Sequence, residues 1–154
     1  MVFPKYTYDQ FDKIKDPMNI IFKNATLDEI KLRFDQFNWR FRGKYAELTW
    51  DQFTPDLSPR SKQDAQRVKG SFWKRYHVRI WKLPDTSYHV ASAHNERFTL
   101  AFGHKPYNFE SAKDRIEETF DGSDNWEIKP GEHDLENRDD ETYHNGLATE
   151  IEHS

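Results

Sequence analysis

The side chains best suited to chemistry lie in two neighbouring segments of the sequence, residues 74–83 and 88–96. The first segment carries His77 and Arg79, and the second carries His94. Imidazole and guanidinium groups together can bind phosphate and transfer protons, as in general acid–base catalysis. These three residues are therefore the candidate catalytic residues for binding or hydrolysing a phosphate-containing or other anionic ligand.

A second chemistry becomes available when a carboxylate joins the histidines. His77, His94 and Glu96 offer two imidazoles and one carboxylate, a ligand set for zinc or another divalent metal. The chain contains no cysteine, so a protein metal site must use histidine and carboxylate ligands. A divalent metal is therefore the candidate cofactor. The candidates for further contact with a ligand are Trp81, Ser92, Glu96 and His104.

Both interpretations depend on how the two segments pair. They are predicted to form a β-hairpin whose turn is Pro84–Ser87. The register that follows pairs Leu83 with Tyr88, Trp81 with Val90, Arg79 with Ser92, and His77 with His94. Cross-strand partners lie about 4.5–5.5 Å apart at Cβ. A slip of one residue would send the two histidines to opposite faces and dismantle the site.

Two interpretations without chemistry stay open. In the first, His77 and His94 are a half-buried cross-strand pair, and Arg79 stacks on Trp81 or Trp73. In the second, the domain is a non-catalytic interaction module whose aromatic-rich sheet face docks a protein or nucleic-acid partner. The pattern identifies no reaction by itself, so the sequence does not decide whether the domain is an enzyme.

The elements that position these residues follow from hydrophobic periodicity. Met18–Phe22 is a short apolar run that predicts a buried strand. Thr26 begins a capping box and a helix over about residues 27–38. Asn108 caps a second helix over about residues 109–121.

Three further segments have local signals only. Ser61–Val68 is predicted to be a short helix, and Thr49–Phe53 a helical turn. Gly103–Pro106 is predicted to be a turn that brings His104 toward the histidine face.

The chain has 154 residues, and residues 1–128 are predicted to form one α+β domain. This domain is predicted to have a small, mainly antiparallel sheet and two principal helices packed on one face. Residues 129–154 are expected to be a disordered acidic tail. From Pro130 onward the sequence has eight acidic residues and one basic residue, a net charge of −7, whereas residues 1–129 carry +3.

Composition also limits the cellular location and the classes of partner that we expect. The sequence has no apolar run long enough to span a membrane and no signal-peptide core, so we expect no membrane insertion and a cytoplasmic location. The expected partner is a small anionic ligand or a protein, with nucleic acid a weaker candidate because the body is only mildly basic.

The order of several short motifs resembles the LssY C-terminal domain family. The most recognisable piece is Arg75-x-His77-x-Arg79-x-Trp81. The other matching pieces, over about residues 16–120, are Asp16–Phe22, Asn38-Trp39, Arg60, Asp64, Lys69, Ala91–Glu96, His104 and the Asp114-Arg115 pair. The resemblance implies the limits of the folded core and directs attention to the same histidine and arginine positions. It implies no reaction, because the activity of the family is unassigned.

Overall fold

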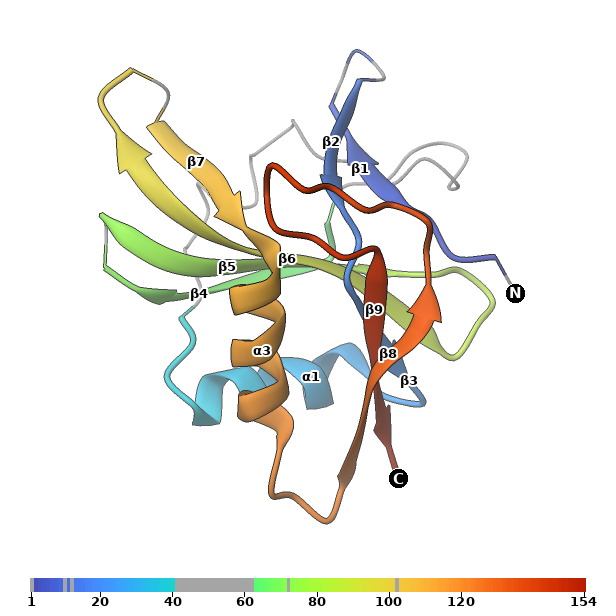
Figure 1. Cartoon of the computed structure of the whole chain (residues 1–154). Helices are drawn as coiled ribbons and strands as arrows, with labels where there is room; N and C mark the ends of the chain where they lie inside the picture. Colours follow the sequence, from blue (N-terminus) through green and yellow to red (C-terminus); the bar gives the residue numbers. More distant parts are fainter. Residues whose placement is uncertain (1, 10, 12, 41–62, 72, 102) are drawn as a thin grey trace.

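The computed structural model describes residues 2–9, 11, 13–40, 63–71, 73–101 and 103–154. Within these residues the chain forms nine strands and two helices (Figure 1). In chain order they are β1 (Tyr6–Tyr8), β2 (Ile14–Pro17), β3 (Ile20–Lys23), α1 (Leu27–Gln36), β4 (Ala65–Gly70), β5 (Lys74–Lys82), β6 (Tyr88–Thr99), β7 (Gly103–Asn108), α3 (Phe109–Phe120), β8 (Trp126–Asp134) and β9 (Leu147–His153).

Seven of these strands form one mixed sheet. Their order is β4-β5-β6-β3-β9-β8, and β7 pairs with β6. The β3–β9 pair is parallel and the other pairs are antiparallel. β1 and β2 form a separate two-stranded sheet. The predicted α+β fold with a small, mainly antiparallel sheet is therefore wrong, because the described part of the chain is mostly β with a large mixed sheet.

The C-terminal segment belongs to the sheet, so the prediction of a disordered tail is also wrong. β9 lies directly beside β3, with Ile20 opposite Thr149, and Ile151 is fully buried. The acidic side chains there have partners. Glu150 is buried and lies 3.4 Å from Lys129 Nζ and 3.0 Å from His133 Nε2. Pairing of this kind offsets the cost of folding a segment rich in carboxylates.

Both predicted helices are confirmed. The capping box of α1 is present, since Glu29 N–H donates to Thr26 Oγ1 (3.1 Å) and Thr26 N–H donates to Glu29 Oε1 (2.8 Å). Asn108 Oδ1 accepts from Ser111 N–H (2.9 Å) at the start of α3. Among the described residues, no helix is both long and apolar enough to cross a membrane.

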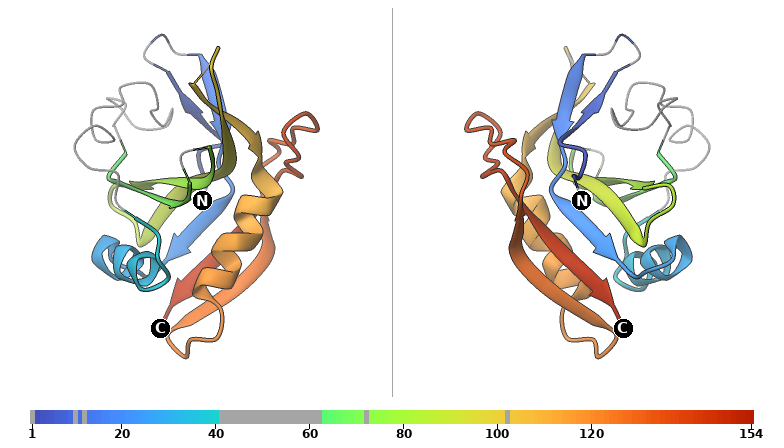
Figure 2. Two further views of the ribbon diagram at one scale, coloured as in Figure 1. Left: turned by 90° about the vertical axis from the view of Figure 1, so that its left-hand side faces the viewer. Right: turned by 90° about the vertical axis from the view of Figure 1, so that its right-hand side faces the viewer.

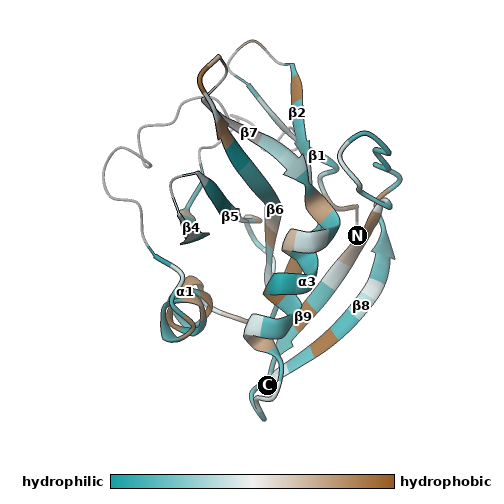
Figure 3. Cartoon of the chain, turned by 60° about the vertical axis from the view of Figure 1, so that its left-hand side comes forward, coloured by the Kyte–Doolittle hydropathy of each residue, from teal (hydrophilic) through white to brown (hydrophobic). Residues whose placement is uncertain are grey.

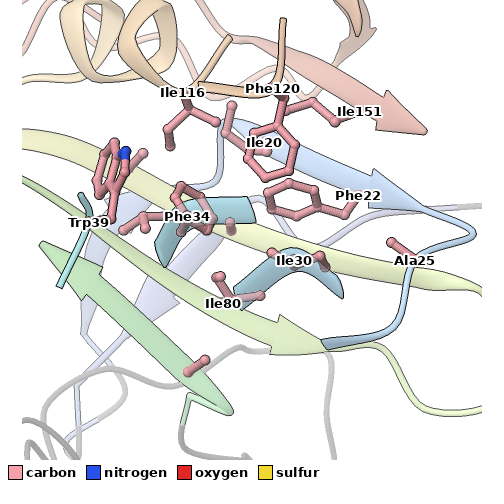
Figure 4. Close-up of a cluster of buried hydrophobic side chains, with 14 of the residues drawn as sticks. Ile20, Phe22, Ala25, Ile30, Phe34, Trp39, Ile80, Ile116, Phe120 and Ile151 are labelled. Atoms are coloured by element: carbon pink, nitrogen blue, oxygen red, sulfur yellow. The ribbon is translucent and has the colours of Figure 1, made fainter. Parts of the chain in front are cut away.

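Apolar side chains from both helices meet those of the sheet in a first core (Figure 4). Phe34 of α1 packs edge-on against Phe120 of α3, with ring centroids 5.1 Å apart. The buried residues of this core are Ile20, Phe22, Ala25, Ile30, Phe34, Trp39, Ala65, Val78, Ile80, Ala91, Ala93, Ala112, Ile116, Phe120 and Ile151. The helices therefore cover the face of β5 that presents Val78 and Ile80.

A second core lies against the face of β5 that presents Trp81. Its buried residues are Phe3, Met18, Ile21, Trp81, Leu83, Val90, Leu135 and Ala148. The N-terminal segment and the chain between β8 and β9 contribute to it, and these segments lie on the side of the sheet away from α1 (Figure 2). His77 and Arg79 share the parity of Trp81, so they lie on this second face.

Two local predictions fail. The helix predicted over Ser61–Val68 is wrong where the structure describes it, because Ala65–Gly70 is strand β4, paired with β5. The turn predicted at Gly103–Pro106 is the start of strand β7. In both places cross-strand pairing overrides weak local propensity. The predicted helical turn at Thr49–Phe53 lies outside the described residues.

The side chain of Asn19 lies in the gap between two strands that pair with the same edge of β6. Along this edge β3 pairs with residues 88–91 of β6, and β7 pairs with residues 95–99. Between them, the Asn19 side chain accepts from Ala93 N–H (2.9 Å) and donates to Ala93 C=O (2.8 Å). An amide side chain thus replaces a strand partner and fixes the backbone beside His94.

Candidate metal centre

The predicted hairpin register is confirmed. His77 pairs with His94, Arg79 with Ser92, and Trp81 with Val90. The turn closes as expected, with Leu83 N–H donating to Tyr88 C=O at 3.1 Å. Two strands with a fixed register therefore bring the two imidazoles to one place on the second face of the sheet.

Glu96 joins these two histidines to complete a compact cluster. One ligand atom from each of His77, His94 and Glu96 can be chosen so that all three lie within 4.8 Å of one another. Glu96 Oε2 is 2.7 Å from His94 Nε2 and 3.5 Å from His77 Nδ1. The three residues are 4%, 2% and 3% exposed, so the cluster is buried.

A second layer of residues holds each member of the cluster on its outer side. Gln66 Oε1, from β4, lies within hydrogen-bond distance of His77 Nε2. Arg75 Nε donates to Glu96 Oε1, the oxygen that faces away from the histidines. Asp16 Oδ2 lies 3.7 Å from His94 Nδ1. Each of the three members thus has one atom directed inward and another atom beside a polar partner.

Electrostatics set the charge of the cluster. Burial raises the pKa of Glu96, but its contacts with His77 and His94 outweigh burial and hold this pKa well below its ordinary value. Burial, followed by the charge of Arg79, lowers the pKa of His77 to about 3. At neutral pH the cluster therefore contains an ionised carboxylate and a neutral His77, the protonation states that a metal ion requires.

The nitrogen atoms of His77 are unequally satisfied. A neutral imidazole has one N–H, and Gln66 Oε1, an acceptor, favours the tautomer that carries this N–H on Nε2 of His77. Nδ1 of His77 then presents a lone pair toward Glu96. Among the described residues, this buried Nδ1 has no hydrogen-bond partner. Nδ1 lies 3.5 Å from Glu96 Oε2, so the space between them is bridged either by the proton of the other tautomer or by a cation.

The other predicted site residues have different surroundings. Arg79 is 9% exposed, and its Nη1 donates to Gln63 Oε1 at 3.3 Å. Ser92 Oγ donates to the Pro17 carbonyl at 2.7 Å. Trp81 is fully buried in the second core, away from solvent. The backbone of His104 lies in β7 opposite Phe98.

Sequence reasoning missed Arg75, Gln66 and Asp16 as partners of the cluster. The contact of Arg75 could have been predicted from the sequence, because the register that pairs His77 with His94 also places Arg75 opposite Glu96. Gln66 was hidden by the incorrect helix prediction for its segment. No local signal connects Asp16 with His94, since they meet only through the tertiary fold.

Comparison with family models, curated proteins and solved structures finds no match for this chain. The resemblance to the LssY C-terminal domain family therefore stays a prediction, and the function of the site has to be inferred from its own geometry.

Proposed function

We propose that this domain binds a divalent transition-metal ion through His77 Nδ1, His94 Nε2 and Glu96 Oε2. One observation carries the proposal, namely that three buried ligand atoms converge within 4.8 Å while their outer atoms face Gln66 and Arg75. Metal-binding histidines commonly give their second nitrogen to an oxygen acceptor, which fixes the ring and the tautomer. Gln66 has this position for His77.

The ligand set indicates which metals to consider. Two histidines and one carboxylate occur in zinc sites and in non-haem iron(II) sites that keep positions open for water or substrate. Asp16 Oδ2 lies 3.7 Å from His94 Nδ1, too far for a hydrogen bond but on the side of the ring where a carboxylate partner of a metal-bound histidine would lie. We therefore take zinc as the first candidate and iron(II) as the second.

The same centre connects the metal with the anionic ligand expected from the sequence. Without a cation, the ionised Glu96 at the middle of the cluster opposes the approach of phosphate. A bound divalent ion would reverse the sign of the charge there and supply Lewis acidity. Arg79 lies close enough to His77 to lower its pKa, so it adds positive charge beside the centre. The function we propose is therefore metal-dependent binding or hydrolysis of a phosphate-containing ligand.

The alternative of a partner-docking sheet face has less support at this position. His77, Arg79 and Trp81 are all buried, and the second core covers the end of the face that carries Trp81. A docking face needs exposed apolar area. This part of the sheet offers little of it.

The test is titration of the metal-free protein with Zn²⁺ and Co²⁺, followed by calorimetry and by visible absorption of cobalt. We expect one ion per chain, and loss of binding in Glu96→Gln and His77→Ala. The matched control is His133→Gln, which removes a histidine that also pairs with a glutamate but lies outside the cluster. Circular dichroism checks that each variant is folded.

Two results of the titration would contradict the proposed metal site. If the wild-type protein binds neither zinc nor cobalt, the cluster is a metal-free network and the proposal fails. If His133→Gln abolishes binding and Glu96→Gln does not, the metal lies elsewhere and the proposal also fails. Addition of inorganic phosphate to the cobalt form then tests the ligand, since we expect the cobalt spectrum to change.

A further inference from the structure

Two hairpins project from the same end of the molecule with apolar tips. The β1–β2 and β6–β7 hairpins both point away from α1 and from the α3–β8 turn (Figures 1 and 2). Leu100, in the β6–β7 turn, is 95% exposed, and Phe11, in the β1–β2 turn, is 73% exposed. Figure 3 shows hydrophobic residues at the end of the β6–β7 hairpin and on strand β2. The two tips therefore place exposed apolar side chains at the same end of the molecule.

Aromatic packing supports the tip of the longer hairpin. Trp73, at the β4–β5 turn, is 65% exposed and packs edge-on against Phe98 of β6, with ring centroids 5.4 Å apart. Phe98 N–H donates to Trp73 C=O at 3.0 Å. The exposed Trp73 thus lies on a fixed backbone beside the hairpin that carries Leu100.

Basic residues accompany the apolar tips. Lys74 of β5 and Arg97 of β6 are direct cross-strand partners, and both are exposed. Like charges directly opposite each other destabilise a sheet. The lysines of the β1–β2 hairpin, Lys13 and Lys15, are balanced by aspartates of the same hairpin, and Lys15 Nζ lies 3.9 Å from Asp9 Oδ2. The unbalanced charge is the Lys74–Arg97 pair, and a pair of cations kept at this cost indicates attraction to an anionic partner.

The opposite end of the molecule has an acidic hollow. A hollow with a volume of about 520 Å³ there is lined by Asp114, Glu117, Glu118, Asp121, Ile128 and Pro130. The basic pair beside Leu100 therefore lies far from this acidic hollow. An anionic plane would attract the Lys74–Arg97 pair more strongly than the hollow.

We propose that the β1–β2 and β6–β7 hairpins dock the domain on an anionic lipid surface. Leu100, Phe11 and Trp73 enter the headgroup boundary, and Lys74 and Arg97 contact lipid phosphates. Aliphatic tips on two separate hairpins suit a bilayer better than a single-stranded nucleic acid, which needs a continuous row of stacking rings. Docking of this kind is peripheral and does not require a segment that crosses the membrane. The proposal is independent of the metal centre.

The test is co-sedimentation of the full chain with vesicles of phosphatidylcholine, with and without added phosphatidylglycerol. We expect binding to the anionic vesicles only, and weaker binding as salt increases. Leu100→Ser should weaken binding about tenfold, and Lys74→Glu about fivefold or more. Their controls are Leu32→Ser and Lys31→Glu on α1, since Leu32 is also exposed but lies away from the hairpins.

Several results would overturn this proposal. Absence of binding to anionic vesicles would do so, as would equal binding to neutral vesicles. Equal losses in Leu100→Ser and Leu32→Ser would show that the effect is not specific to the hairpin. A parallel titration with a fluorescent single-stranded oligonucleotide completes the test. If the oligonucleotide binds through Lys74 while the vesicles do not, the surface belongs to nucleic acid.

Discussion

His77 of β5 and His94 of β6 are direct cross-strand partners whose rings meet edge to face, with centroids 5.3 Å apart. Glu96 follows two residues after His94 on the same face and contacts both rings. The three groups are therefore positioned by the backbone ladder of two long strands, which is a rigid support for a site. This relationship gives the proposed metal centre its geometry and leads to the first prediction.

Gln66 should tune the metal affinity without contacting the metal. We expect Gln66→Met to lower zinc affinity by about tenfold to a hundredfold, because it removes the acceptor of the His77 N–H. Competition with a chromophoric chelator measures this affinity. Gln36→Met, an exposed change on α1, is the control. Equal affinities of Gln66→Met and the wild type would show that Gln66 does not orient His77.

In the presence of a chelator, the free energy of unfolding should fall as the pH drops from about 6.5 toward about 3. The pKa of His77 is lowered from 6.5 to about 3, so across this window the unfolded state binds a proton that the folded state does not. This single difference costs about 1.4 kcal/mol per pH unit.

Glu96 acts in the same direction at lower pH. Its folded pKa lies below its ordinary value, so its contribution is present above that value and is lost as the pH falls. Urea unfolding at a series of pH values gives the slope. We expect His77→Gln to reduce the slope between pH 6.5 and about 3 by about one proton. An unchanged slope would contradict a buried, neutral His77.

Two glycines with positive φ should respond differently to alanine. Gly70 has φ +127°, and a Cβ there would lie 2.7 Å from Lys74 O and 2.9 Å from Arg75 Cα. Gly122 has φ +73° and nothing within 4 Å of its added Cβ. We expect Gly70→Ala to lower the free energy of unfolding by about 3 kcal/mol, and Gly122→Ala by about 1 kcal/mol. Chemical denaturation measures both, and equal losses would refute the close approach at the β4–β5 turn.

The C-terminal strand should be essential for stability. Ile151 of β9 is fully buried in the first core, so Ile151→Ala should lower the free energy of unfolding by about 2–5 kcal/mol. Leu32→Ala removes an equally large side chain from an exposed position and should change it by less than about 0.5 kcal/mol. Thermal and urea unfolding measure the difference. If the two variants are equally stable, β9 does not belong to the core.

The sequence by itself determined the β5–β6 hairpin, its register and the two helices. These features depend on neighbours a few residues apart. Alternation along each strand, a turn at Pro84–Ser87, the capping box at Thr26 and the cap at Asn108 all act locally. For this reason local patterns alone bring His77, His94 and Glu96 together, and the confirmed register also places Arg75 opposite Glu96.

The way in which distant segments complete the sheet and the site follows from tertiary packing alone. β9 pairs with β3 across more than a hundred residues, and its acidic composition concealed that Glu150 has Lys129 and His133 as partners. Gln66 reaches His77 only because β4 pairs with β5. The physical reason is that weakly biased segments take the structure that buries apolar surface and satisfies backbone hydrogen bonds in the assembled sheet, and those partners are invisible along the local sequence.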